Sequence, residues 1–218
     1  MDNKATYKVG YWAAVLVALE VAAFAAMLVA GLLGRDTGYF SFAVCFLLAA
    51  SYVALATGIY QYSSNKRKIW ANLGLDFSIM YAVLCSVSYY VQFAVVRNNS
   101  LQLPDSILKA FVYTPGSFVF ALNMLGYAFL CLSTLMLVPV FYGRSQRERW
   151  LRRFMAFHGI FIIPTMIFPA LKLGSGHALQ SASQFGNYAL LFWCVIFIPI
   201  PLILAGIFKD MARPIKAN

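Results

Sequence analysis

Three titratable side chains, Glu20, Asp76 and His158, lie within or near the ends of apolar runs in this 218-residue sequence. If each run crosses a membrane as a helix, a rise of about 1.5 Å per residue places them about 12, 9 and 5 Å below the same surface. A carboxyl group at such depth needs a proton, a partner or water, and buried carboxyls mark ion routes in many carriers. We expect these residues to form a ligand or proton pathway, provided that helix rotation turns them toward one another. The alternative is a purely structural, protonated Glu20 bonded to a neighbouring hydroxyl or backbone group.

A second polar set lies toward the opposite surface and contains Tyr89, Gln92, Asn123 and Tyr127. Asn123 and Tyr127 are four residues apart and therefore share one helix face. On antiparallel helices these four side chains reach similar depths, and they combine aromatic walls with hydrogen-bonding groups. That composition is typical of a small-molecule pocket, so we expect an outer pocket here. The alternative is an interfacial aromatic belt with interhelical hydrogen bonds.

Five arginines cluster in the segment 144–154, whose sequence is RSQRERWLRRF. Trp150, Leu151 and Phe154 lie beside these charges, as in segments that lie at the level of lipid head groups. We expect the cluster to contact anionic head groups, and we expect no nucleic-acid partner. The arginines are Arg144, Arg147, Arg149, Arg152 and Arg153.

Other chemistry finds little support in the sequence. The two histidines, His158 and His177, fall on opposite sides of the expected membrane, and the four cysteines are far apart. No metal-ligand, phosphate-loop or nucleophile-elbow spacing is present. We therefore assign no catalytic residue, metal or cofactor, and we lean against an enzyme.

These residues would be positioned by long apolar helices. The chain is 62% hydrophobic and 11% charged, far more apolar than a soluble domain. Six runs approach or exceed the length that crosses a bilayer as a helix. The sequence predicts an all-α, polytopic integral membrane protein, a six-helix bundle forming a single domain over residues 1–218. The expected spans are residues 12–33, 39–60, 70–96, 117–142, 155–172 and 186–208.

Details of these runs predict further features. Small residues in the first run predict close helix packing, and the short link after it predicts an antiparallel hairpin with the second. Pro164, Pro169, Pro199 and Pro201 predict kinks in the last two runs. Residues 105–113 predict a short amphipathic helix on the outer surface.

Basic residues indicate the orientation in the membrane. If the termini and the second and fourth loops share one side, that side holds 13 of the 17 Lys and Arg residues. Positive charge is retained on the cytoplasmic side, so we expect both termini to be cytoplasmic.

Three functions fit these features. The first is a small membrane protein, expected to be a homo-oligomer, that binds or transports a small solute or ion through a helix-bundle cavity. The second is a non-transporting membrane partner, sensor or assembly subunit. The third, an intramembrane enzyme, would depend on Glu20, Asp76 and His158.

Overall fold

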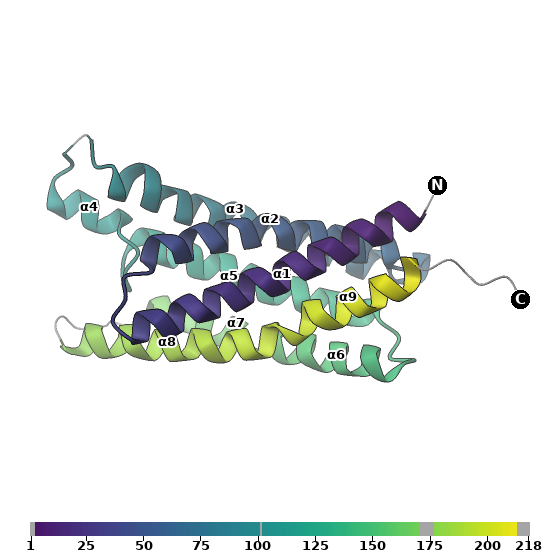
Figure 1. The fold of residues 1–218 in the computed structure, drawn as a ribbon. Coiled ribbons are helices and arrows are strands. Elements are labelled where there is room, and N and C mark those ends of the chain that lie inside the picture. The colour runs from purple at the N-terminus through teal and green to yellow at the C-terminus, as the bar shows by residue number, and fades with distance from the viewer. Residues whose placement is uncertain (1–2, 101, 171–176, 213–218) are drawn as a thin grey trace, which may run out of the picture.

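The structure, a computed structural model, is an elongated bundle of helices that lie side by side (Figure 1). It describes residues 3–100, 102–170 and 177–212, and the side chains of 5–100, 102–170 and 185–212. Within these ranges the chain contains helices and no strand. In chain order the elements are α1 (Asn3–Leu32), α2 (Gly38–Tyr62), η1 (Asn65–Arg67), α3 (Lys68–Val91), η2 (Gln92–Arg97), α4 (Asp105–Phe111), α5 (Phe118–Leu137), η3 (Val138–Val140), α6 (Gln146–Gly159), α7 (Ile162–Ile167), η4 (Phe168–Ala170), α8 (His177–Phe197) and α9 (Pro199–Ala212).

In the described part of the chain, six stretches of helix are long and apolar enough to cross a membrane. This confirms the all-α class and the number of long apolar helices, and it suggests a multi-pass membrane protein. The fifth stretch begins at Gln146 rather than near 155, because Ser145 caps α6 by accepting a hydrogen bond from the Glu148 N–H (3.1 Å). The stretches are Ala5–Leu32, Gly38–Tyr62, Asn65–Arg97, Phe118–Val140, Gln146–Ala170 and Phe185–Ala212.

Close packing of α1 against its neighbours depends on glycine. A Cβ at Gly58 on α2 would lie 2.9 Å from the Gly10 Cα on α1, and a Cβ at Gly10 would lie 3.0 Å from the Phe208 ring on α9. Because glycine has no Cβ, two helix backbones can approach closely at these positions. The close approach increases dispersion contacts, which matter in lipid because helices there gain nothing from the hydrophobic effect by associating. The predicted hairpin of the first two helices is confirmed, and α9 packs beside α1 at the same end.

The bundle centre is filled by aromatic rings, and two of its hydroxyls, those of Tyr52 and Ser133, form hydrogen bonds between helices. The Tyr52 ring meets the Tyr81 ring edge-on, with 5.8 Å between centroids, and both residues are fully buried. The hydroxyl of Tyr52 lies 3.0 Å from Ser133 Oγ, and Ser133 Oγ also bonds the Gly74 carbonyl at 2.6 Å. These contacts tie α2, α3 and α5 into one core.

The predicted proline kinks occur as breaks in the last two spans. Between α6 and α7, Pro164 has no N–H for the Ile160 carbonyl, which instead accepts from the Ile163 N–H at 3.1 Å. Pro199 occupies the first position of α9, and Figure 1 shows the chain changing direction between α8 and α9. Both breaks follow from the missing proline donor.

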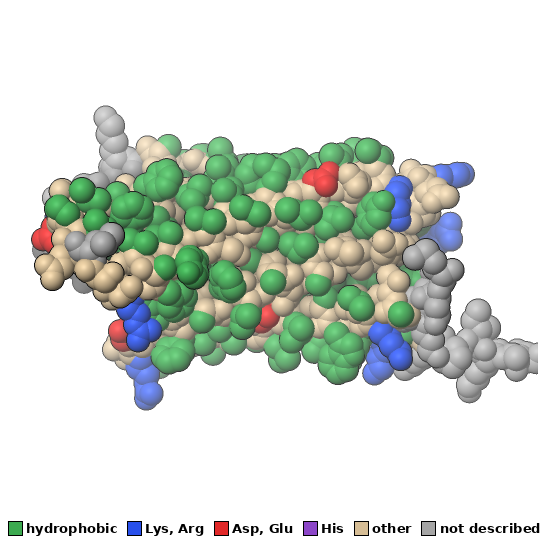
Figure 2. Space-filling model, turned by 90° about the horizontal axis from the view of Figure 1, so that it is seen from above, with side chains coloured by type: hydrophobic (Ala, Val, Ile, Leu, Met, Phe, Trp, Pro, Cys, Tyr) green, Lys and Arg blue, Asp and Glu red, His purple; other side chains and the backbone are tan. Residues whose placement is uncertain are grey.

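The surface separates into an apolar middle and charged ends. Figure 2 shows hydrophobic side chains along the length of one face, with Lys and Arg gathered toward the two ends. The beginning of α1 and the end of α9 lie at the same end of the bundle (Figure 1), here called the terminal end. The opposite end, which carries α4, is called the outer end.

Candidate functional site

A cavity of about 380 Å³ lies in the outer half of the bundle. All six candidate spans contribute to its lining, which is mostly aromatic and aliphatic. Its volume falls in the range of small-molecule sites, about 300–1,000 Å³. Its lining residues are Phe24, Met27, Leu28, Gly31, Thr37, Gly38, Ser41, Phe42, Cys45, Tyr89, Tyr113, Pro115, Phe120, Met124, Tyr127, Cys131, Phe161, Pro164, Thr165, Phe168, Phe185, Gly186, Asn187, Ala189, Leu190 and Trp193.

Two tyrosine hydroxyls form a polar spot in this apolar lining. Tyr89 on α3 and Tyr127 on α5 place their hydroxyl oxygens 3.1 Å apart, and both side chains are almost fully buried. One hydroxyl donates to the other, so a hydrogen remains to be donated and lone pairs remain to accept. Phe42 stacks against Tyr89, with 5.9 Å between ring centroids. A ligand in the cavity would meet a hydrogen-bonding pair bordered by rings.

Trp193 of α8 forms another part of the cavity wall, and residues outside the cavity fix its position. Its indole is 4% exposed, meets Tyr127 edge-on at 5.7 Å and stacks on Phe197 at 4.9 Å. The indole N–H donates to His158 Nε2 at 2.8 Å. This bond fixes the plane of the indole on the cavity wall.

The partners of His158 determine its tautomer. Because Nε2 accepts from Trp193, the proton of the neutral imidazole lies on Nδ1 and is donated to Thr134 Oγ1 at 2.8 Å. Thr134 in turn donates to the Cys131 carbonyl at 2.9 Å. His158 is fully buried, and both ring nitrogens are satisfied. It therefore links α5, α6 and α8 rather than facing a water-filled route.

Gln92 and Asn123 lie behind the cavity rather than in its lining. Gln92 Nε2 donates to the Phe111 carbonyl at 2.8 Å, while Oε1 accepts from the Tyr113 N–H at 3.1 Å. Asn123 Oδ1 accepts from the Tyr113 hydroxyl at 2.8 Å. Together they fasten Tyr113, which does line the cavity. The outer pocket expected from sequence thus contains two lining residues, Tyr89 and Tyr127, and two supporting ones.

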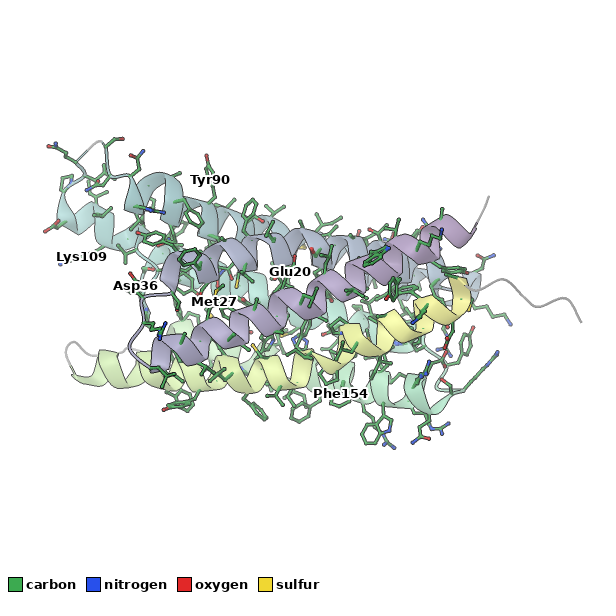
Figure 3. All side chains as sticks on the ribbon, in the orientation of Figure 1. Glu20, Met27, Asp36, Tyr90, Lys109 and Phe154 are labelled. Carbon is green, nitrogen blue, oxygen red and sulfur yellow. The ribbon has the colours of Figure 1, made fainter. Side chains whose placement is uncertain are left out.

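Glu20 lies midway along α1 and faces α2 (Figure 3). Its Oε1 accepts from the Ser51 hydroxyl at 2.9 Å, and its Oε2 is buried with no hydrogen-bond partner among the described residues. Glu20 does not line the cavity, but Phe24, one helical turn further along α1, does. The carboxyl therefore lies about one turn beyond the cavity wall.

The structure does not bring the three titratable residues together. Asp76 is exposed on α3 and accepts from Asn72 Nδ2 at 2.9 Å, whereas His158 has Thr134 and Trp193 as partners. Sequence periodicity did not fix the rotation of each helix about its axis, so similar depth did not imply contact. The sequence left open whether the three residues converge, and in the structure each has different partners. A role for each residue stays a prediction.

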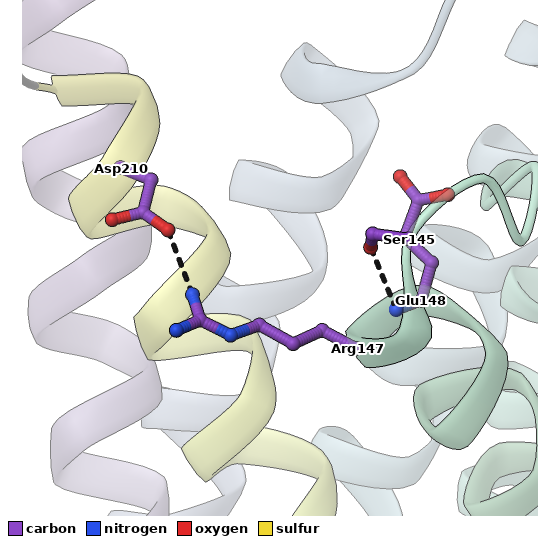
Figure 4. Close-up of polar contacts among 4 residues, drawn as sticks. All are labelled: Ser145, Arg147, Glu148 and Asp210. Carbon is purple, nitrogen blue, oxygen red and sulfur yellow. Dashed lines mark hydrogen bonds and ion pairs between the residues drawn. The ribbon is translucent and has the colours of Figure 1, made fainter.

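The five arginines of the basic cluster lie at the terminal end, on α6 and just before it. Arg147 forms an ion pair with Asp210 of α9 at 2.7 Å, which Figure 4 shows beside the Ser145–Glu148 cap. Arg144 lies over the Tyr142 ring, 4.7 Å from its centroid. The Tyr142 hydroxyl lies 2.8 Å from the Ser64 hydroxyl. This hydrogen bond is the largest cause that lowers the pKa of Tyr142, and the charges of Arg67 and Arg144 add to it.

Several lining residues were missed by the sequence analysis, above all Trp193, Phe42 and Met27. A signal existed for α8, where Phe185, Ala189 and Trp193 recur every four residues and share one face. The sequence pattern of this stripe is the same for a helix face that contacts lipid and for one that lines a cavity. In the described residues no group of three His, Cys, Asp or Glu side chains could hold a metal ion.

The geometry thus provides an aromatic cavity with a tyrosine pair, a tryptophan held by a buried histidine, and a separate mid-bundle carboxyl. Comparison with known protein families, curated proteins and solved structures finds no match for this chain.

Proposed function

We propose that this chain is a multi-pass membrane protein that binds a small, largely apolar molecule in the outer-half cavity, with both termini in the cytoplasm. The observation that carries the proposal is the cavity lining, in which the Tyr89–Tyr127 pair is a hydrogen-bonding spot amid aromatic and aliphatic side chains. Ligand sites commonly combine apolar walls with few, well-placed polar groups. The preferred ligand has an apolar body and an oxygen that bonds the tyrosine hydroxyls.

Tryptophan fluorescence gives a direct test, because Trp193 is 4% exposed whereas Trp12, Trp70 and Trp150 are 40–61% exposed. A variant with those three tryptophans changed to Phe retains Trp193 alone. Menadione, an apolar naphthoquinone with two carbonyl acceptors, is the quenching probe. Saturable quenching of Trp193 in detergent supports a bound ligand. Quenching that rises linearly with probe concentration contradicts the proposal and favours the assembly-subunit function.

Ser41 offers a matched pair of variants for the same assay. Its side chain lines the cavity on α2. Ser41→Phe places a ring in the space that the ligand needs, so saturable quenching is lost. Ser41→Ala removes only the hydroxyl and keeps quenching.

Transport of the bound molecule is a second candidate, favoured by the position of Glu20. The carboxyl lies one turn along α1 from a lining residue, and its Oε2 is buried without a partner among the described residues. A carboxyl that exchanges a proton at this depth could couple ligand movement to protons. Uptake into proteoliposomes that depends on a pH gradient separates transport from binding alone.

A further inference from the structure

A groove at the terminal end shares no lining residue with the cavity and has different chemistry. It has a volume of about 320 Å³ and is lined by Val138 of η3 and by Arg149, Arg152, Arg153 and Ala156 of α6. The four α6 residues are spaced i, i+3, i+4 and i+7, so they form one stripe along the helix. All four are exposed, whereas Leu151 and Met155 on the opposite face are buried.

The three groove arginines lack acidic partners. Among the described residues none of them forms an ion pair, whereas Arg147 on the same helix is paired with Asp210. Arg149 reaches only the carbonyls of Gly143 and Arg144, each at 3.4 Å. Like charges at three- and four-residue spacing destabilise a helix. The stripe therefore concentrates positive charge that no ion pair within the described part of the chain compensates.

The position of these arginines in the chain increases their need for an anionic partner. Arg152 and Arg153 lie in the second turn of α6, within the stretch Gln146–Ala170 that is apolar enough to cross a membrane. Trp150, 46% exposed, lies beside them and has its ring 4.9 Å from the Arg153 guanidinium carbon. Exposed tryptophan and arginine at a helix end are typical of the headgroup level. An anion that reaches the groove would come from that layer or from the adjacent solution.

We infer that the groove formed by Arg149, Arg152 and Arg153 binds a phosphate group, presented by an anionic phospholipid whose acyl chain runs along Val138 and Ala156. Guanidinium groups bind phosphate oxygens with paired, charge-assisted hydrogen bonds. The two apolar lining residues suit the lipid part of the same molecule. A phosphate bound there offsets the repulsion within the stripe and stabilises the junction of α6 with η3.

The test compares phosphatidylglycerol with phosphatidylcholine, added at equal mole fraction to the full-length protein in detergent, with the apparent unfolding temperature as readout. Phosphatidylglycerol is expected to give a saturable rise beyond that from phosphatidylcholine. The groove variant, Arg149→Gln with Arg152→Gln and Arg153→Gln, is expected to bind phosphatidylglycerol about tenfold more weakly.

A charge-matched control removes three basic groups at the same end but outside the groove: Arg144→Gln, Arg147→Gln and Lys209→Gln. It should retain the apparent affinity for phosphatidylglycerol. Equal loss in both triple variants would mean diffuse attraction to net charge and would overturn the inference, as would a wild-type protein that does not distinguish the two lipids.

Further measurements identify the source of the phosphate and guard against misfolding. Inorganic phosphate, tested against chloride at equal ionic strength, should not stabilise lipid-depleted protein; stabilisation that the groove variant loses would assign the site to free phosphate. If the groove variant does not elute as folded protein, the three arginines are changed to Lys instead. That variant keeps the charge but loses the paired geometry, so it should bind phosphatidylglycerol more weakly than wild type, and unchanged binding would overturn the inference.

Discussion

His158 shows how much one buried side chain organises near the cavity. Its two ring nitrogens join Thr134 of α5 to Trp193 of α8, and the ring itself packs against Phe197 with 4.8 Å between centroids. Sequence analysis placed this residue in a proton pathway because of its depth. The structure gives it a positioning role behind the cavity wall, and its place in a pathway stays a prediction.

Removing this histidine should loosen Trp193. His158→Leu leaves the indole N–H and the Thr134 hydroxyl with one hydrogen bond fewer each, and interhelical hydrogen bonds in lipid contribute about 0.6–1.7 kcal/mol. We expect a loss of about 1–3 kcal/mol in stability and a red-shifted emission in the variant that retains Trp193 alone. His158→Gln, whose amide can both donate and accept, should restore part of both. Unchanged emission in His158→Leu would contradict the positioning role.

A substitution at Glu20 can distinguish ligand binding from transport. Glu20→Gln preserves the shape of the side chain and an oxygen that accepts from Ser51, but it cannot exchange a proton. We expect saturable quenching of Trp193 by menadione to persist and pH-driven uptake to be lost. The control Asp105→Asn, exposed at the start of α4, should leave uptake unchanged. Uptake that survives Glu20→Gln would remove the carboxyl from the mechanism.

Residue types predicted that a pocket lies in this region, but they did not predict which side chains line it. Tyr89 and Tyr127 line the cavity as expected, because antiparallel helices brought residues of similar depth together. Gln92 and Asn123, equally deep, turn toward Tyr113 instead. Depth follows from counting residues along a helix, but the direction of a side chain depends on packing that a single sequence does not display.

Neighbouring helices pack most closely at a few glycines. Gly58→Ala places a Cβ 2.9 Å from the backbone of Gly10, so α1 and α2 must separate, and overpacking of this kind costs about 1–3 kcal/mol. A lower unfolding temperature in detergent is expected. Gly206→Ala on α9 is the control, because its Cβ would meet only the flexible Arg147 side chain at 3.6 Å. Similar unfolding temperatures for the two variants would contradict tight α1–α2 packing.

The outer helix α4 depends on Gln92. Its amide bonds two backbone groups, the Phe111 carbonyl and the Tyr113 N–H, and leaving buried polar groups without partners costs about 1–3 kcal/mol each. Gln92→Leu should raise amide hydrogen exchange across residues 105–113. Gln61→Leu, at an exposed position near the end of α2, should not. Protection that is equal in both variants would show that the loop is held by other contacts.

At the element scale, the sequence was informative wherever backbone chemistry decides the outcome. Missing proline donors predicted the breaks before Pro164 and Pro199, and Pro104 with Asp105 predicted the start of α4. The length of α6 was underestimated because its first turns are basic. The amphipathic helix runs on into the apolar span, with Leu151 and Met155 buried against the bundle.

At the scale of the whole molecule, two features of the sequence are informative: the apolar middle of the bundle and the distribution of basic residues at its ends. Six apolar helices of sufficient length were predictable from hydropathy, since a backbone in lipid must satisfy its hydrogen bonds within helices. The cavity was not predictable at this scale, because its volume is the space that imperfectly matched side chains from six helices leave between them.

Orientation is the prediction that belongs to the molecule as a whole, and cysteine labelling can measure it. The four native cysteines are buried, so a membrane-impermeant maleimide should report introduced residues. Asp36→Cys, exposed in the loop between α1 and α2, should react in intact cells, whereas Lys66→Cys, exposed at the terminal end, should react only after permeabilisation. The expectation follows from the excess of Lys and Arg at the terminal end. The reverse pattern would place the cavity on the cytoplasmic side, and reaction of both in intact cells would contradict a bundle that spans the membrane.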